Sequence, residues 1–267
     1  MYSLMFGGFV GSEQNQGSDW GEKLLNTVAS NTISHLFTRS DRVDVEVRCN
    51  PSSKLLQGSI DSFRMTGSGL VIRREFRTEE MSFETDAVSL DFSSVLKGKI
   101  SLKQPTQAIA TVKLSEVDIN RAFSAQLVRQ HLENLTLPQL TDLSGGQPVN
   151  FTDIKLSLLP HNRIELFANA DLGNRKVPVS LSCTLGIAKR RRILFQDVKF
   201  EPKDIPEEMQ DISETLTEIL GEILNGMVDL DRFNLDGVML RLNRLETQGK
   251  MLVFSGYAQI ERIPQTG

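Results

Sequence analysis

The 267-residue sequence is poor in the residues that most often carry chemistry. It has two cysteines, Cys49 and Cys183, and three histidines, His35, His131 and His161. Two distant cysteines suggest neither a disulfide framework nor a metal cage, and both stand in alternating apolar patterns that predict buried thiols. No histidine has a partner at a metal-ligand spacing, and glycine-rich phosphate loops and nucleophile elbows are missing. We therefore expect a protein without metal or cofactor that is not an enzyme.

The sequence also lacks a charge excess of one sign and a long apolar run. Its formal net charge is −4 and its isoelectric point is near 5.5, which argues against a nucleic-acid binder. No segment is long and apolar enough to cross a bilayer. Residues 1–11 are apolar but short, and they lack the basic region of a signal peptide. We expect a cytoplasmic protein that could be peripheral to an internal membrane, with a flexible apolar segment at residues 1–18. Residues 1–11 could insert shallowly into a bilayer or simply be disordered or packed.

Helical periodicity marks three segments. The first starts near Asp19, a suitable N-cap, and the second near Ser115, which begins an approximate capping box and leads a helix through Leu132. The third is the strongest, with Asp204 as a plausible cap and Pro206 in its first turn. Its wide apolar stripe either lines a cavity for a lipid or packs as core against a sheet. The candidate lipid-contacting residues are Leu216, Leu220, Ile223, Leu224 and Met227.

Most of the remaining sequence alternates with a period of two. The runs at 43–47, 88–92 and 177–187 read as strands, and 154–172 and 238–260 read as hairpins. A turn is expected at 67–69, ahead of a further strand. Strands with one apolar face are typical of antiparallel sheet covered on one side. Small residues fall at predicted inward positions, where they leave room for acyl chains or for a close helix: Ala108, Ala110, Ala168, Ala170, Gly256 and Ala258.

The order of these elements indicates the fold class. Each predicted helix is followed by a strand pair, and residues 112–119 align weakly with 198–205 where a strand passes into a helix. We predict an α+β fold in which curved antiparallel sheets wrap around long amphipathic helices. The domain should span 19–264, with duplicated halves of about 19–137 and 149–264 joined by a connector at 136–149.

A basic run is the one feature that suggests a contact with a charged surface. Lys189, Arg190, Arg191 and Arg192 lie between two strand patterns and should project from a turn. They either contact anionic lipid headgroups or form a solvated hairpin tip. The acidic residues that follow the third helix, Asp229, Asp231 and Asp236, do not match a calcium loop and suggest a solvated helix end.

The sequence resembles the LmeA-like phospholipid-binding family over roughly residues 24–264. The resemblance is carried by residues 55–63, 90–99, 113–120 and the closing segment from 235–238 to 249–256. These are signatures of fold and not of catalysis. The resemblance implies a cup or elongated tube of curved sheet around helices, with a phospholipid in its apolar interior.

Three hypotheses remain open at this point. The leading one is a protein that binds a phospholipid or glycolipid in an apolar cavity and carries or presents it at a membrane surface. The alternative is a membrane-peripheral scaffold or assembly factor with a filled interior. The third is an enzyme acting on a lipid-linked substrate. A continuous apolar cavity favours the first hypothesis, and a filled core favours the second.

Overall fold

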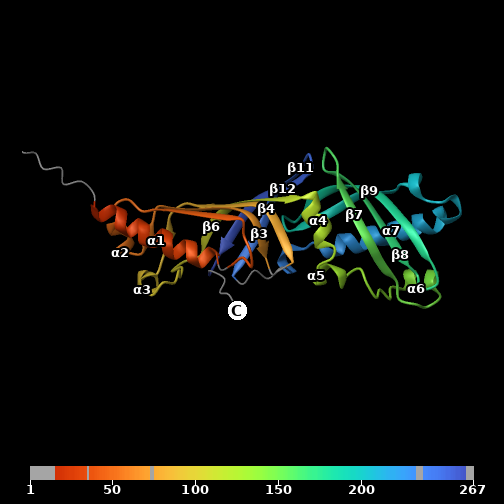
Figure 1. Cartoon of the computed structure of the whole chain (residues 1–267), viewed down its shortest axis with the longest axis horizontal. Coiled ribbons are helices and arrows are strands. Elements are labelled where there is room, and N and C mark those ends of the chain that lie inside the picture. Colours follow the sequence, from red (N-terminus) through yellow and green to blue (C-terminus); the bar gives the residue numbers. More distant parts are fainter. Residues whose placement is uncertain (1–15, 35, 73–74, 233–236, 263–267) are drawn as a thin grey trace, which may run out of the picture.

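The alternating apolar residues build two antiparallel sheets that lie end to end along an elongated molecule (Figure 1). The computed structural model describes residues 16–34, 36–72, 75–232 and 237–262. Predicted features at residues 1–15, His35 and Asp236 lie outside these ranges. The mixed α+β class with mostly antiparallel sheet is confirmed.

The larger sheet has six strands and occupies the half of the molecule that contains the first helix. Its strand order is β1-β3-β4-β6-β12-β11, and all neighbours are antiparallel. The helix α1 (Gln16–Ser34) runs beside this sheet. The strands are β1 (Arg42–Arg48), β3 (Ser62–Ile72), β4 (Phe76–Thr85), β6 (Thr106–Ser115), β11 (Val238–Gln248) and β12 (Met251–Ile260).

A two-stranded ribbon and two single-turn helices cover the outer end of this half. The ribbon pairs β2 (Ser59–Ile60) with β5 (Val88–Ser89). The helices are α2 (Ser53–Leu56) and α3 (Phe92–Leu96). A hydrophobic cluster closes this end, and it includes Leu25, Val47, Leu55, Ile60, Leu90 and Val95.

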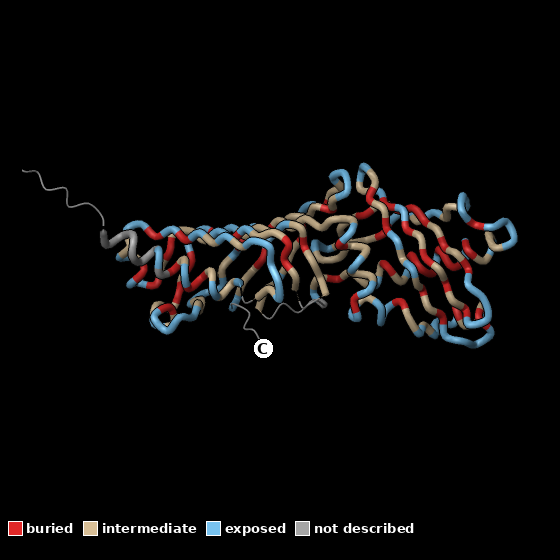
Figure 2. The backbone as a smooth tube through the Cα atoms, viewed as in Figure 1, coloured by how far each residue is buried: buried red, intermediate tan, exposed pale blue. Residues whose placement is uncertain are grey.

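The smaller sheet has the order β10-β9-β8-β7 and packs against α7 (Gln210–Met227). Its strands are β7 (Asn150–Leu158), β8 (Arg163–Asp171), β9 (Lys176–Ala188) and β10 (Arg192–Phe200). The short helices α4 (Glu116–Ala122), α5 (Gln126–Arg129) and α6 (Pro138–Ser144) connect the two sheets in sequence. Buried positions are dense in this half, whereas intermediate exposure dominates along the six-stranded sheet (Figure 2).

Several predicted elements match the structure. Both predicted hairpins form, as β7–β8 and β11–β12, and the run at 177–187 lies in β9, the longest strand at 13 residues. Ser115 caps α4, because its hydroxyl accepts a hydrogen bond from the Asp118 N–H at 3.1 Å. Cys49 and Cys183 are buried thiols as predicted, and burial raises the pKa of the Cys183 thiol to about 12.

The predicted helix boundaries are wrong in three places. The α1 helix begins at Gln16, so Asp19 lies inside it. The second helix is broken into α4 and α5, because Ala125 takes an extended backbone conformation between them. The third begins at Gln210, because Ile205 and Pro206 are extended and the entry consists of short 3-10 turns at Pro202–Asp204 and Glu207–Met209.

One strand prediction and one turn prediction are also wrong. The predicted 88–92 strand is limited to Val88–Ser89 and a single bridge from Leu90 to Leu102, because the side chain of Asp91 accepts a hydrogen bond from the Ser93 N–H and starts α3. Residues 67–69 do not form a turn but lie within β3, where Gly67 faces Met81 of β4.

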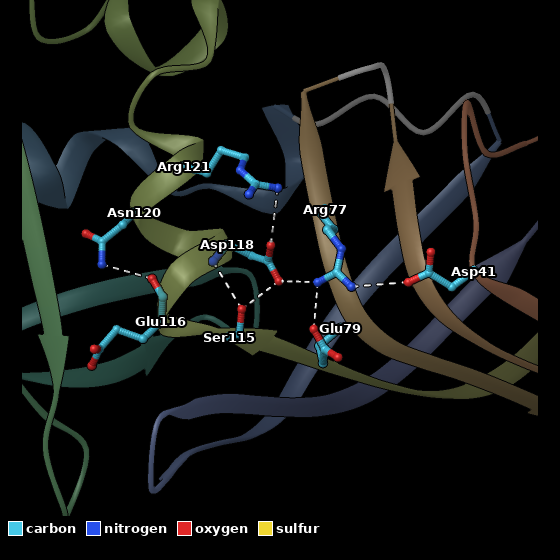
Figure 3. A network of polar contacts seen from close by, with 8 residues as sticks. All are labelled: Asp41, Arg77, Glu79, Ser115, Glu116, Asp118, Asn120 and Arg121. Atoms are coloured by element: carbon cyan, nitrogen blue, oxygen red, sulfur yellow. Dashed lines mark hydrogen bonds and ion pairs between the residues drawn. The ribbon is translucent and has the colours of Figure 1, made fainter.

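The helix α4 fixes the two sheets to one another through polar side chains (Figure 3). On one side, the nearly buried carboxylate of Asp118 pairs with Arg77 of β4 at 2.8 Å. Hydrogen bonds to Glu79, and further contacts with Asp118, raise the pKa of Arg77. On the other side, Asn120 exchanges two hydrogen bonds with the backbone of Leu156 in β7, at 2.7 and 2.8 Å. An ion pair that is partly buried, as Asp118–Arg77 is, stabilises the fold only when both charged groups have partners. Glu79 and Ser115 supply the additional contacts to Arg77 and Asp118.

Candidate ligand-binding pocket

An apolar pocket of about 480 Å³ lies between α1 and one face of the six-stranded sheet. Pockets of this size are within the range that holds small ligands. Its lining is overwhelmingly aliphatic and aromatic and is contributed by α1 and by every strand of the sheet. Lining residues include Leu25, Ala29, Ile33, Val47, Phe63, Met65, Met81, Phe83, Val112, Leu240 and Phe254.

The lining side chains show that this face is not a filled core. Phe63, Met81, Phe83 and Phe254 point to the interior side of the sheet but are only partly buried. Side chains in a packed core are close to fully buried, with voids smaller than a water molecule. The helix α1 therefore covers the sheet without filling the space beneath it.

Small residues deepen the pocket at its centre. Ala110 of β6 is flanked by Phe83 of β4 and by Gly256 of β12, and all three line the pocket. A Cβ at Gly256 would collide with the backbone oxygen of Arg241, so only glycine fits beside this bulged part of β11. Of the predicted small inward positions, Ala168 and Ala170 instead pack in the core of the other half.

The pocket carries its charged group at one edge. Arg241 is the single charged residue of the lining that the structure describes, and it lies on β11, the edge strand of the sheet. It faces Tyr257 across the β11–β12 pair and is ion-paired to Asp231 at 2.8 Å. Hydrogen bonds from Arg191 and then Arg241 lower the pKa of Asp231. Ile109, Tyr257 and Arg241 lie opposite one another on neighbouring strands, so the Arg241 side chain is on the outer face at the edge of the sheet, and the other described lining residues are uncharged.

The predicted lipid-contacting residues of the third helix lie elsewhere. Leu216, Leu220 and Leu224 are at most 2% exposed in the core between α7 and the four-stranded sheet. Ile223 and Met227 are partly buried against the same core. None of these five described residues lines the pocket. The residues that line the pocket include Phe63, Met65, Met81 and Phe83. In the sequence, phenylalanine and methionine alternate at these positions, and methionine is flexible enough to form an adaptable apolar surface.

The predicted basic run forms the β9–β10 turn, but all three of its arginines are engaged in contacts within the fold. Lys189 and Arg190 have positive φ angles of 49° and 56°, as a tight hairpin turn requires. Arg190 donates to Asn243 at 2.5 Å and lies 5.8 Å from the centroid of the Tyr257 ring. The other two arginines of the run contact the acidic segment that follows α7.

The prediction of a solvated helix end is wrong for Asp229, which is buried, whereas Asp231 is exposed but ion-paired. Arg192 donates to the buried Asp229 at 2.7 Å, and Arg191 pairs with Asp231. The hydrogen bond from Arg192 lowers the pKa of Asp229. The turn is therefore bound to the segment that leads from α7 into β11.

Reversing these arginines should weaken the fold as well as any membrane contact. We expect Arg191→Glu/Arg192→Glu to lower the thermal unfolding temperature, because two carboxylates would then face Asp229 and Asp231. The control is Lys189→Glu, whose side chain is exposed at the same turn. Equal unfolding temperatures for the double variant and wild type would show that the ion pairs of Arg191 and Arg192 contribute nothing to stability. The contact of Lys189, Arg190, Arg191 and Arg192 with a membrane stays a prediction, tested by binding of Lys189→Glu to anionic vesicles.

The described residues offer neither a metal site nor a membrane-spanning helix. No group of three or more His, Cys, Asp or Glu side chains is arranged to hold a metal ion within the ranges that the structure covers. No helix within those ranges has the length and hydropathy needed to cross a membrane.

The fold and the pocket define an α+β protein with mostly antiparallel sheet and a largely apolar pocket. The chain belongs to the LmeA-like phospholipid-binding family, whose model matches residues 17–256. This confirms the resemblance seen in the sequence, and it assigns the chain to a family of lipid-binding domains that is not a known enzyme family. No curated protein and no solved structure shows a significant match.

Proposed function

We propose that this protein binds the acyl part of a phospholipid or glycolipid in the pocket beneath α1 and carries or presents that lipid at a membrane surface as a peripheral protein. The observation that carries the proposal is the apolar pocket of about 480 Å³ in a chain of a phospholipid-binding family. Each methylene transferred from water into such a pocket contributes about 0.8 kcal/mol. The pocket needs no catalytic group for this role.

The polar edge supports an orientation for the lipid. Arg241 of the edge strand and its partner Tyr257 on β12 border the lining, with their side chains on the outer face of the sheet. A phosphate or sugar headgroup at this edge would remain close to water and compete with Asp231 for the guanidinium of Arg241. Charge-assisted bonds of guanidinium to phosphate are well suited to this exchange.

We further propose that residues 19–264 act as one lipid-binding unit with a tubular interior. Each sheet packs with one long helix, which supports an origin by duplication, although β11 and β12 of the second predicted half have joined the six-stranded sheet. The halves would then have diverged, with α7 packed tightly and α1 covering a pocket. The packed half also supports the scaffold hypothesis, because its dense core and polar joint to the other sheet suit a rigid support for a protein partner.

The test is to identify what the purified protein carries. Organic extracts of gently purified protein should contain a phospholipid or glycolipid at a fixed ratio to protein, measured by mass spectrometry. Delipidated protein should rebind a fluorescent acyl probe, and unlabelled lipid should displace the probe. If the protein neither retains nor rebinds any amphiphile, the proposal is overturned and the scaffold hypothesis remains.

A further inference from the structure

Two leucines are exposed at the outer end of the six-stranded half, although leucine is usually buried. Leu56 and Leu96 are 70% and 62% exposed, and they end the single-turn helices α2 and α3. The same local arrangement occurs twice. A buried aliphatic residue, Leu55 or Val95, anchors the turn, the leucine after it faces outward, and a glycine with positive φ follows two residues later.

The two helices belong to one structural end. The backbone N–H of Leu90, just before α3, donates to the oxygen of Gly58, just after α2, at 2.7 Å. The ribbon of β2 and β5 joins the same two segments. In Figure 1, α2 and α3 both lie at the end where α1 begins.

Positive charge accompanies the exposed leucines. Lys97 and Lys99 directly follow Leu96 and are exposed, and Lys103 is exposed at the base of the same loop. Nearby carboxylates are engaged within the fold. Asp91 accepts hydrogen bonds from the hydroxyls of Ser93 and Ser94 and from the backbone of Ser93. Asp61 is held by the Asn50 N–H and by Lys54.

We infer that this end, formed by Leu56, Leu96, Lys97 and Lys99, docks on an anionic lipid surface. The leucines would enter the interface between headgroups and acyl chains, as apolar residues of peripheral proteins do. The lysines would lie at the headgroups, where each positive charge strengthens binding severalfold at low salt. Together they match the two layers of such a surface, apolar and anionic.

This end lies next to the pocket, so docking would assist lipid loading. This part of the inference rests on the proposed function. Ile60, Leu90, Ile100 and Leu102 line the pocket and flank the two helices in the sequence. Docking would therefore bring the pocket, whose outer end is closed by the hydrophobic cluster, close to the bilayer that supplies its lipid. Loading of the pocket in solution does not depend on the docking, so the two ideas can fail separately.

The experiment compares binding of the full chain to two kinds of vesicle. One is pure phosphatidylcholine and the other is phosphatidylcholine mixed with phosphatidylglycerol. We expect Leu56→Ser/Leu96→Ser to weaken binding to the mixed vesicles at least about tenfold. Lys97→Glu/Lys99→Glu should do the same at low salt and less at high salt. Uptake of a fluorescent acyl probe in solution should stay at the wild-type level in both variants.

Matched controls separate docking from general surface effects. Val117→Ser changes an apolar residue that is 67% exposed on α4, and Arg175→Glu/Lys176→Glu reverses two exposed charges at the β8–β9 turn. Both should bind vesicles like wild type. Equal losses in controls and test variants would overturn the proposal, and so would test variants that bind the mixed vesicles as tightly as wild type.

A gain-of-signal variant tests the docking without any loss of stability. Leu96→Trp should show a blue shift of its fluorescence, beyond that of wild type, when mixed vesicles are added, because the indole enters a less polar medium. Val117→Trp should show no such additional shift. If the fluorescence of the Leu96→Trp variant shifts no more than that of wild type although the protein binds the vesicles, the membrane contact lies elsewhere and the inference is overturned.

Discussion

Ala110→Phe should weaken binding of an acyl probe at least about tenfold while leaving the protein folded. Ala110 lines the centre of the pocket, between Phe83 and Gly256 on the neighbouring strands. A phenyl ring at this position would occupy space that the ligand needs. Exclusion of only two methylenes costs about 1.6 kcal/mol, which exceeds a tenfold change in affinity. The measurement is titration of delipidated protein with a fluorescent fatty acid.

The neighbouring residue provides the matched control. Ile109 precedes Ala110 on the same strand but is 59% exposed on the opposite face of the sheet. Ile109→Phe adds a ring of the same kind without entering the pocket, so its probe affinity should equal that of wild type. The unfolding temperature of Ala110→Phe should stay near the wild-type value, because the ring enters existing space and not a filled core. Normal affinity in a folded Ala110→Phe protein would mean that the ligand does not occupy this pocket.

Leu216→Ala and Leu220→Ala should each lower the free energy of unfolding by about 2–5 kcal/mol. Both side chains are fully buried between α7 and the four-stranded sheet. Truncation there leaves a new cavity that the surrounding strands cannot fill. Probe uptake by the folded fraction should be unchanged, because neither residue lines the pocket. Urea unfolding and probe titration give the two measurements.

A leucine of the pocket should behave in the opposite way. Leu36 follows α1, lines the pocket and is partly exposed. Leu36→Ala enlarges an existing space, so we expect a small loss of stability and weaker probe binding. Glu218→Ala controls for substitution on the exposed face of α7. If truncations on α7 cost little and also lower uptake, the lipid lies beside α7, as the sequence predicted, and the proposed pocket would have to be abandoned.

The charge network at α4 explains how one half can be open while the whole remains rigid. In the pocket half, α1 covers the sheet above the pocket, and a buried cluster lies at the outer end. The joint through Asp118, Arg77 and Asn120 binds this sheet to the four-stranded half, whose core is dense. Hydrogen bonds between Asn162 and Thr247, at 2.9 and 3.0 Å, add a second link between the halves. These contacts hold the sheet that lines the pocket against the densely packed half.

Local patterns in the sequence were sufficient to predict most strands and the fold class. Period-two alternation found β1, β9 and both hairpins, because an antiparallel strand with one buried face needs that spacing wherever it lies. Helix ends were less predictable. Asp204 and Pro206 carry the right chemistry for a helix start, yet the extended conformation of Ile205 and Pro206 moves the start to Gln210. A cap depends on backbone angles that neighbouring strands help to set.

The sequence by itself determined the family, through residues 55–63, 90–99 and 113–120, and it determined that long amphipathic helices would cover antiparallel sheet. Only the tertiary structure decided which helix covers a pocket. The stripes of α1 and α7 are both apolar, and hydrophobicity drives burial in either case without specifying what lies opposite. The space beneath a helix depends on the volumes contributed by strands distant in sequence. Phe195 and Leu181 help to fill the core beside α7, whereas Ala110 and Gly256 leave space under α1.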